Sequence, residues 1–398
     1  MTPDRLFTPR FFVMCGFTFT VFLSVFQLIP VSPFHIRDLG GGSLASGLFL
    51  GFLTFASAWS APFTGVLADR FGRRHTLMGA SLGLAGFTAS YAFIHSYSLL
   101  LALVLAHGIV WSSLLSASAA YMTDVLPVSR RAEGIAYWGL SSIIALAVAP
   151  SFGFWVYRHG WGWLCAGTTA LNLGMAAIAY YLRVDHETGH AHPHAHVGPW
   201  IERRVLLLSM PLFLYAYGYG TISSFSAVYA DALGVRPKAI FLTTMAAVTL
   251  VTRPLFGRLA DRVGYRQMFM PCLVAMALGL CILPWATTRA LLMVSAGIFA
   301  IGFGTSYPVF AAYVMQDIPE RRRGAAFGAI LAAFDTGIGT GSTLTGWLIG
   351  RAGFPIAFGT AAALATLALP AFLLVDRIAN RSHAAQPGPP AAAETPLA

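Results

Sequence analysis

Long apolar segments separated by short polar breaks run along almost the whole chain, from Phe11 to Val375. A helix needs roughly 20 residues to cross the hydrocarbon of a bilayer. Each segment is continuously apolar and does not alternate with a period of two, which favours helices over the strands of a barrel. The pattern predicts twelve spans, at 10–32, 44–64, 76–94, 98–120, 134–156, 162–183, 204–227, 239–257, 267–285, 290–312, 324–348 and 355–376.

The composition supports this interpretation. Of the 398 residues, 57% are hydrophobic and only 10% are charged, whereas soluble domains carry about 25% charged residues. The first span follows Arg5 and Arg10, but no small-residue cleavage site comes after it, so we expect a retained helix and not a signal peptide. The predicted fold class is an all-α membrane protein.

The formal net charge of +10 comes mainly from arginines in alternate loops. By the positive-inside rule the arginine-rich side is cytoplasmic, which places both termini in the cytoplasm. Because the basic residues occupy short loops and not one soluble face, no nucleic-acid partner is expected. The arginine-rich side holds Arg70, Arg73, Arg74, Arg130, Arg131, Arg203, Arg204, Arg258, Arg262, Arg266, Arg321, Arg322, Arg323, Arg377 and Arg381.

The chain contains an internal repeat. The segment Ser60 to Arg74, SAPFTGVLADRFGRR, returns as Thr252 to Arg266, TRPLFGRLADRVGYR. Each copy follows the second span of a block of six, so the repeat predicts two pseudo-symmetric six-helix bundles at 1–183 and 204–377. A linker at 184–203 joins them, and a Pro- and Ala-rich tail at 378–398 is expected to be disordered.

The linker carries five histidines, His186, His190, His192, His194 and His196. Imidazoles bind zinc, copper and nickel, but the tract has no fixed ligand geometry, and a flexible linker is the preferred interpretation. Four cysteines, Cys15, Cys165, Cys272 and Cys281, lie in apolar spans without CxxC spacing. The sequence predicts no metal site and no cofactor.

The motif G-x-L-A-D-R-x-G-R-R, from Gly65 to Arg74, strongly resembles the signature loop of the major facilitator superfamily. The resemblance implies the major facilitator fold, transport of a small molecule across the lipid bilayer, and a monomer. It also implies that the two loops gate the halves, while topology signalling alone is the plainer interpretation. The gating residues would be Gly65, Asp69, Arg70, Gly72 and Arg73, with Gly257, Asp261, Arg262, Gly264 and Arg266 in the second copy.

The last spans, including GFGTSYPVFAAYVMQDIPERRRG, are similar to bacterial drug or sugar efflux permeases of the proton antiporter branch. Val104 stands where many of those antiporters have an arginine in the fourth span, and His107 stands where a glutamine is common. The resemblance therefore suggests proton-coupled efflux across a bacterial inner membrane but does not supply the usual basic residue.

Three ionisable residues lie at membrane depth, where such groups are costly and default functional candidates. Asp335 is the first choice for the protonation site, and a structural pairing with Arg253 is the alternative. His107 can relay protons because imidazole titrates near neutral pH, or it can make an interhelical hydrogen bond. We predict proton coupling through Asp335, Arg253 and His107.

Polar and aromatic side chains on other spans are candidates for a substrate cavity, with ordinary packing as the alternative. They are Gln27, Trp111, Trp138, Tyr215, Tyr219 and Tyr307. A cavity of this kind suits amphipathic or weakly charged solutes.

The predicted function is secondary active transport, export of a small amphipathic molecule in exchange for protons by alternating access. Two transport alternatives remain open: export of a siderophore or metallophore, and import of a sugar, amino acid or organic acid. We find no G-x-S-x-G elbow, no phosphate-binding loop and no pair of metal ligands on one helix face that would indicate an enzyme. No catalytic residue is predicted.

Overall fold

The computed structural model describes residues 5–182, 203–316, 318 and 323–384. Within these residues all regular structure is helical, which confirms the predicted fold class. The helices of the first half are α1 (Pro9–Leu28), α2 (Ser32–Asp38), α3 (Ser43–Phe71), α4 (Arg73–Tyr91), α5 (Tyr97–Val125), α6 (Arg131–Tyr157) and α7 (Trp161–Tyr181), with a 3-10 turn at Val128–Arg130.

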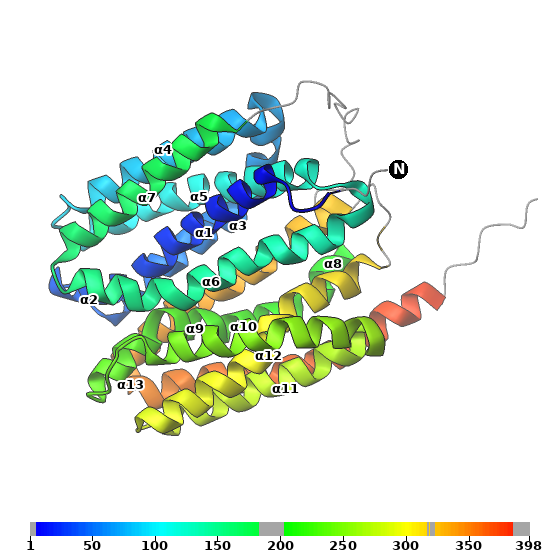
Figure 1. The fold of residues 1–398 in the computed structure, drawn as a ribbon. Helices are drawn as coiled ribbons and strands as arrows, with labels where there is room; N and C mark the ends of the chain where they lie inside the picture. The colour runs from blue at the N-terminus through cyan, green and yellow to red at the C-terminus, as the bar shows by residue number, and fades with distance from the viewer. Residues whose placement is uncertain (1–4, 183–202, 317, 319–322, 385–398) are drawn as a thin grey trace, which may run out of the picture.

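The second half contains α8 (Arg203–Leu208), α9 (Met210–Ala232), α10 (Ile240–Val263), α11 (Tyr265–Ile282), α12 (Arg289–Met315) and α13 (Arg323–Ala384), with a 3-10 turn at Leu283–Trp285. The long helix α13 contains the last two predicted spans, joined through a kink at Gly353, where φ is 79°. Figure 1 shows the helices of the two halves gathered into two bundles that pack side by side.

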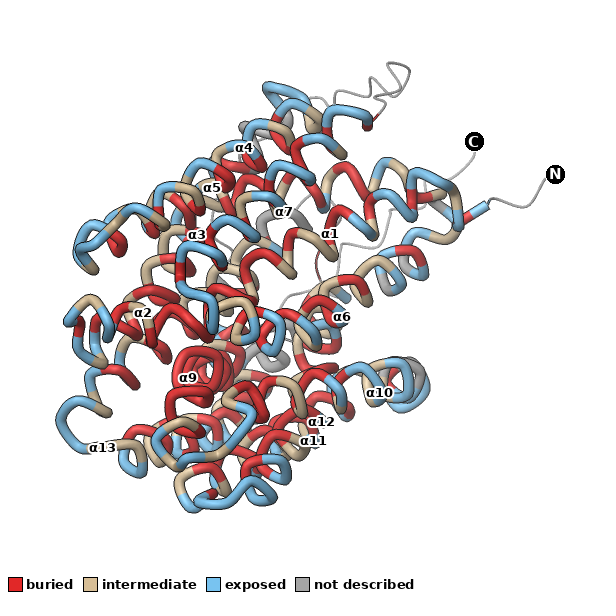
Figure 2. The backbone as a smooth tube through the Cα atoms, turned by 60° about the vertical axis from the view of Figure 1, so that its left-hand side comes forward, coloured by how far each residue is buried: buried red, intermediate tan, exposed pale blue. Residues whose placement is uncertain are grey.

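Eight helical segments of the described chain are long and apolar enough to cross a membrane, and the last of them, Ala326–Ile378, has the length of two spans. The remaining three predicted spans correspond to α4, α9 and α10. Helix α9 is less apolar because it does not need to face lipid: every residue from Leu214 to Ala230 is buried, and Figure 2 shows this helix almost entirely in the buried colour. The serines, glycines and tyrosines of α9 therefore pack against other helices of the protein.

Both halves turn at equivalent glycines. Six glycines in the described chain have positive φ, and they form the pairs Gly40 and Gly234, Gly72 and Gly264, and Gly160 and Gly353. The members of these pairs are 194, 192 and 193 residues apart. The structure thus repeats itself with nearly the offset of the sequence motif.

The expected linker, 184–203, lies outside the described residues except for Arg203, which begins α8. The expected tail began at residue 378, but α13 continues to Ala384, so its first seven residues are helical. The rest of the tail, 385–398, lies outside the described part of the chain. The twelve spans occupy the predicted order along the chain.

The halves meet along two helix pairs, α3 with α13 and α6 with α10. We call the end of the bundle with Gly72 and Gly264 the Gly72 end, and the opposite end the Gly353 end. Near the Gly353 end the backbones of α3 and α13 touch: a Cβ at Gly47 would overlap the carbonyl of Ser342, and one at Gly346 would overlap the carbonyl of Ser43. Glycine permits this close approach.

Candidate functional site

Asp335 lies in α13 between Arg323 and the kink at Gly353, and its half-buried carboxylate faces α3 of the other half. The buried Ser57 hydroxyl donates a hydrogen bond of 3.0 Å to Oδ2 of Asp335. This bond joins the two halves across the α3–α13 interface. The charge of Asp335 in an apolar span marks it as the first candidate in the sequence, but nothing there marks Ser57, because a serine in an apolar span gives no signal of its partner.

An aromatic cluster lies next to Asp335 in the second half, formed by Tyr215, Tyr219, Phe303, Tyr307 and Phe334. The rings of Tyr219 and Phe303 stack with centroids 4.3 Å apart, and Tyr307 lies 5.1 Å from Phe334. Tyr215 contacts Phe334 at 6.1 Å. The structure therefore brings together three of the predicted cavity residues, Tyr215, Tyr219 and Tyr307, beside Asp335.

Arg253 is on α10 and faces α6, the other pair of helices that joins the halves. Its guanidinium Nη2 lies 3.4 Å from the position that a Cβ would take at Gly139 of α6. Among the described residues no hydrogen bond or ion pair joins Arg253 to Asp335, and the described hydrogen-bond partner of Asp335 is Ser57. The two charged groups are on different interface helices, α10 and α13.

His107 is buried inside the first half, between α4 and α5. Its Nδ1 makes a 2.9 Å hydrogen bond with the hydroxyl of Tyr91, and the rings of Phe87 and Tyr91 each stack on the imidazole at 5.9 Å. The indole Nε1 of Trp161 donates to the carbonyl of Tyr91 at 2.9 Å. This geometry supplies the interhelical hydrogen bond that was one of the two expectations for His107.

The remaining cavity candidates belong to the first half. Trp138 donates from Nε1 to the Thr18 hydroxyl at 2.7 Å, which ties α6 to α1. Trp111 packs edge-on against Phe22 at 5.6 Å. Gln27 is buried, and its amide nitrogen has no hydrogen-bond partner among the described residues, so it retains donors for another molecule.

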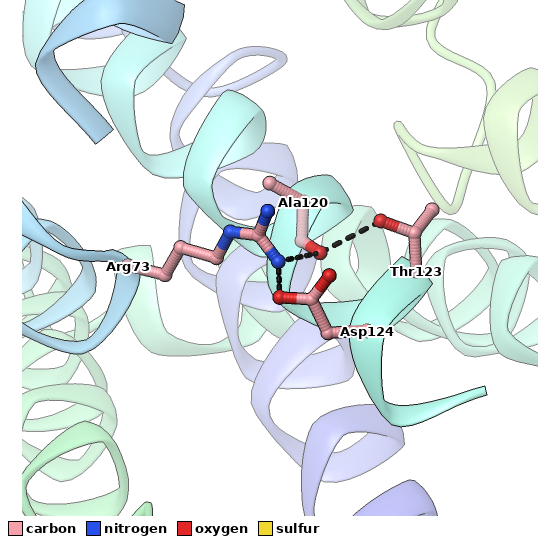
Figure 3. Close-up of polar contacts among 4 residues, drawn as sticks. All are labelled: Arg73, Ala120, Thr123 and Asp124. Atoms are coloured by element: carbon pink, nitrogen blue, oxygen red, sulfur yellow. Dashed lines mark hydrogen bonds and ion pairs between the residues drawn. The ribbon is translucent and has the colours of Figure 1, made fainter. Parts of the chain in front are cut away.

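The first gating loop is held by an ion pair at the start of α4. The guanidinium of Arg73 pairs with Asp124 at the end of α5 and also donates to the carbonyl of Ala120 at 3.0 Å. Figure 3 shows that carbonyl also accepting from the Thr123 hydroxyl, at 2.7 Å. The sequence repeat identified Arg73 but not Asp124, which lies 51 residues further along the chain.

The second loop has an equivalent anchor. Arg266 donates from Nε and Nη2 to Oδ2 of the buried Asp376, both at 2.8 Å, and the Tyr313 hydroxyl donates to the other oxygen of Asp376. In the first half Arg74 occupies the equivalent position and donates to the carbonyl of Tyr180. Each loop therefore ties its helix to the last span of its own half.

The other predicted gating residues divide into two groups. Arg70 and Arg262 are exposed at the ends of α3 and α10, while Gly72 and Gly264 have φ of 83° and 95° and begin the next helices. The side chains of Asp69 and Asp261, and the surroundings of Gly65 and Gly257, lie outside the described part of the structure. The role of the loops as gates stays a prediction.

Two packed bundles of apolar spans, with the carboxylate of Asp335 at their contact, define a polytopic membrane protein. The family model of the Major Facilitator Superfamily matches residues 14–252 and 212–397. The chain belongs to this superfamily and is a secondary transporter of a small molecule. The resemblance stated from the Gly65 loop is thereby confirmed at the level of the superfamily.

Curated relatives cover almost the full length. The chain is 27% identical over 377 residues to the uncharacterized MFS-type transporter YhhS of Escherichia coli K12, covering 92% of this chain and 91% of that protein. It is 26% identical over 360 residues to the uncharacterized MFS-type transporter BMASAVP1_A0869 of Burkholderia mallei, covering 88% of each.

Two solved structures have the same fold. A bacterial homologue of the human lysosomal transporter Spinster, in an inward-facing and occupied conformation, has a TM-score of 0.77 at 15% identity, covering 92% of this chain and 96% of that one. The nucleoside transporter NupG has a TM-score of 0.73 at 14% identity, covering 93% and 100%.

Proposed function

We propose that the protein exports a small amphipathic molecule in exchange for protons, by alternating access, with Asp335 as the proton carrier. One observation carries the proposal: the half-buried carboxylate of Asp335 accepts a 3.0 Å hydrogen bond from Ser57 of the other half. A titratable group at membrane depth marks an ion pathway by default. Here it also lies on the contact between the two parts that must move.

The chemistry of the contact couples the proton to the motion. A carboxylate accepts the hydrogen bond from Ser57, whereas a protonated carboxyl also carries a donor and no charge. The charged form is costly in this apolar setting unless hydrogen bonds hold it. Among the described residues, Tyr307 on α12 is a titratable group close to Asp335. Proton uptake therefore changes how strongly α3 and α13 adhere, which biases the equilibrium between states.

The contacts between the halves favour an arrangement closed at the Gly353 end. There Ser342 donates to the carbonyl of Gly47 at 2.7 Å, and Ser151 and Thr243 are hydrogen-bonded at 2.9 Å. At the Gly72 end the described ion pairs of Arg73 and Arg266 stay within one half. If the arginine-rich Gly72 end is cytoplasmic, this arrangement faces inward and both termini are cytoplasmic.

The substrate class follows from the aromatic cluster beside Asp335, because aromatic rings bind apolar bodies and tyrosine hydroxyls add hydrogen bonds. This supports an amphipathic solute. The membership of the superfamily and the bacterial relatives support a monomer in a bacterial inner membrane. Export of a siderophore or metallophore, and import of a sugar, amino acid or organic acid, are the alternatives that the transport assay must separate.

The test is flux in proteoliposomes loaded with a chemically diverse panel that includes siderophores, with and without an imposed pH gradient. Wild type is compared with Asp335→Asn and with a matched control, Asp38→Asn, which changes a carboxylate at the Gly353 end that accepts from Tyr157. We expect gradient-driven flux in wild type and control, and its loss in Asp335→Asn. Flux that ignores the gradient, or persists in Asp335→Asn, contradicts the proposal.

A further inference from the structure

Arg253 is an isolated cation at membrane depth. Helix α10 runs from Ile240 to Val263, so Arg253 lies about 15 Å from the end at Val263, at 1.5 Å per residue. Among the described arginines and lysines only Arg351 of α13 also lies more than two helical turns from both ends of its helix, and Arg351 is exposed and two residues from the kink at Gly353. It is half-buried and too deep for its charge to be fully hydrated.

Every described carboxylate already has another partner. Six acidic side chains lie in the described part of the chain: Asp38, Asp124, Glu133, Asp231, Asp335 and Asp376. Asp38 accepts from Tyr157, and Asp124 pairs with Arg73. Glu133 pairs with Arg130, and Asp231 pairs with both Arg236 and Lys238. Asp335 accepts from Ser57, and Asp376 pairs with Arg266. Within the described residues Arg253 therefore has no acidic partner.

A second donor without a partner lies one turn away on α10. Thr249 is four residues before Arg253 and so shares its side of the helix. Its hydroxyl is buried, with 3% of the residue exposed, and makes no hydrogen bond among the described residues. Buried polar groups are normally satisfied, so the Thr249 hydroxyl keeps a donor for another molecule one turn from Arg253.

We propose that Arg253 is a specificity-determining residue that binds an anionic group of the transported molecule, most simply a carboxylate. The guanidinium offers several donors in a planar fork that fits a carboxylate. The guanidinium reaches the first half at Gly139, where a Cβ would already contact Nη2 at 3.4 Å. This assignment rests on the proposed transport function and names its substrate class, an amphipathic organic anion with an aromatic or apolar body.

The position of Arg253 at the α6–α10 contact gives the anion a place between the halves. Asp335 lies on α13, which packs on α3, so the two interface pairs carry charges of opposite sign. The aromatic cluster, on α9, α12 and α13 of the same half as Arg253, offers the apolar body of the anion a surface. An anion held by Arg253 is therefore bound by groups of the second half, next to Gly139 of the first half.

The test uses equilibrium binding to the purified protein without any gradient, so it does not depend on proton coupling. The probes are naphthoate and naphthamide, which have the same shape and differ in charge, and binding is followed by thermal shift and tryptophan fluorescence. We expect wild type to bind naphthoate at least about tenfold more tightly, the range of a hydrogen bond to a charged group. Arg253→Gln should lose this preference and Arg253→Lys should keep part of it.

Arg289→Gln is the matched control, because it removes an exposed arginine at the first residue of α12. It should keep the preference, because Arg289 begins α12 at the Gly353 end and does not lie at the α6–α10 contact. Protection of Arg253 from phenylglyoxal in wild type, read by mass spectrometry, checks the contact without any variant: naphthoate should protect and naphthamide should not. Equal binding of both probes by wild type, a preference retained in Arg253→Gln, or absence of protection each overturns the assignment.

Discussion

His107 and Asp335 are both ionisable residues within apolar spans, but their surroundings in the structure differ. The imidazole of His107 lies between aromatic rings inside one half, and its hydrogen bond to Tyr91 joins α4 to α5. The carboxylate of Asp335 instead meets the other half through Ser57. A proton on His107 therefore acts on packing within a bundle, whereas a proton on Asp335 acts on the contact between bundles.

Replacing Tyr91 by phenylalanine tests the structural role of His107. The change keeps the ring and removes the hydroxyl, so a buried imidazole nitrogen loses its partner, which costs about 1–3 kcal/mol. We expect a lower melting temperature in detergent and an unchanged pH profile of transport. Tyr181→Phe is the control, since Tyr181 is 79% exposed and should melt like wild type. A shifted transport pH profile in Tyr91→Phe would favour a proton relay through His107.

Residue types in a run of apolar neighbours show which side chains are unusual but not what they contact. Asp335 is conspicuous because it is a charge in an apolar span. Ser57 and Asp376 are not, because serine is common in spans and Asp376 stands at the end of one. Their partners, Asp335 and Arg266, are 278 and 110 residues away. Pairings over such distances are fixed by helix packing, which no local pattern contains.

At the scale of elements, the turns between helices depend on glycines with positive φ. Gly72 has φ 83° and ψ 142°, and Gly264 has φ 95° and ψ 143°, a region that L-residues occupy only at a cost of order 1–3 kcal/mol. We expect Gly72→Ala and Gly264→Ala each to lower the melting temperature. At Gly72 the nearest atom to a Cβ is 3.7 Å away, so strain and not collision causes the loss, whereas at Gly264 a Cβ would also meet Oε1 of Gln267 at 2.7 Å.

A glycine in the middle of a helix is the control for these two variants. Gly174 lies within α7, and nothing lies within 4 Å of the position of its Cβ. Alanine there should be neutral or stabilising by up to about 1 kcal/mol, the difference in helix propensity. If Gly72→Ala melts at the same temperature as Gly174→Ala, the turn does not need its positive φ.

A cluster of charges at the Gly353 end links the second half to the first. Oδ1 of Asp231 accepts from Arg236 and Lys238, both at 2.9 Å, and the ammonium of Lys238 lies 4.4 Å above the ring of Phe34 on α2. Asp231 lies beyond the predicted span 204–227. Burial raises the pKa of its carboxyl, but the hydrogen bonds and charges of Lys238 and Arg236 outweigh this and hold the pKa below 3.8.

This depressed pKa predicts the pH dependence of an Asp231→Asn variant. A carboxyl whose pKa is lower in the folded state stabilises the fold above its unfolded pKa and loses that contribution as pH falls through the folded value. We therefore expect the melting temperature of wild type to exceed that of Asp231→Asn by a constant margin from pH 7 to about pH 5. The margin should shrink below about pH 4, and a margin that does not depend on pH would contradict the assignment.

At the scale of the molecule, the repeated motif and the number of apolar segments were sufficient to predict the architecture. The offset of 192 residues between the motif copies returns in the paired turn glycines, because both halves fold by the same rules. The sequence could not show how the halves pack, since the contacts of α3 with α13 depend on small residues such as Gly47 that have many other uses. It also could not show that Arg253 and Asp335 lie on different interface helices and form no ion pair among the described residues.

Alternating access predicts that a bond between the halves stops transport, whereas a bond within one half does not. Ser151 and Thr243 join α6 to α10 with their hydroxyl oxygens 2.9 Å apart. Thr88 and Thr169 join α4 to α7 within the first half at the same distance. Paired cysteines at these two sites, in a variant whose four native cysteines are replaced, therefore make a matched comparison.

Oxidation should abolish flux in the double variant Ser151→Cys with Thr243→Cys, and reduction should restore it. Oxidation should leave flux intact in the double variant Thr88→Cys with Thr169→Cys. The reason is that rocking must separate α6 from α10 at the Gly353 end, while α4 and α7 move together as parts of one bundle. Proteoliposome flux before and after oxidation, with crosslinking scored by mass spectrometry, measures both. Full flux through a protein crosslinked at 151 and 243 would mean that the halves do not separate there, and transport would then need a path that opens elsewhere.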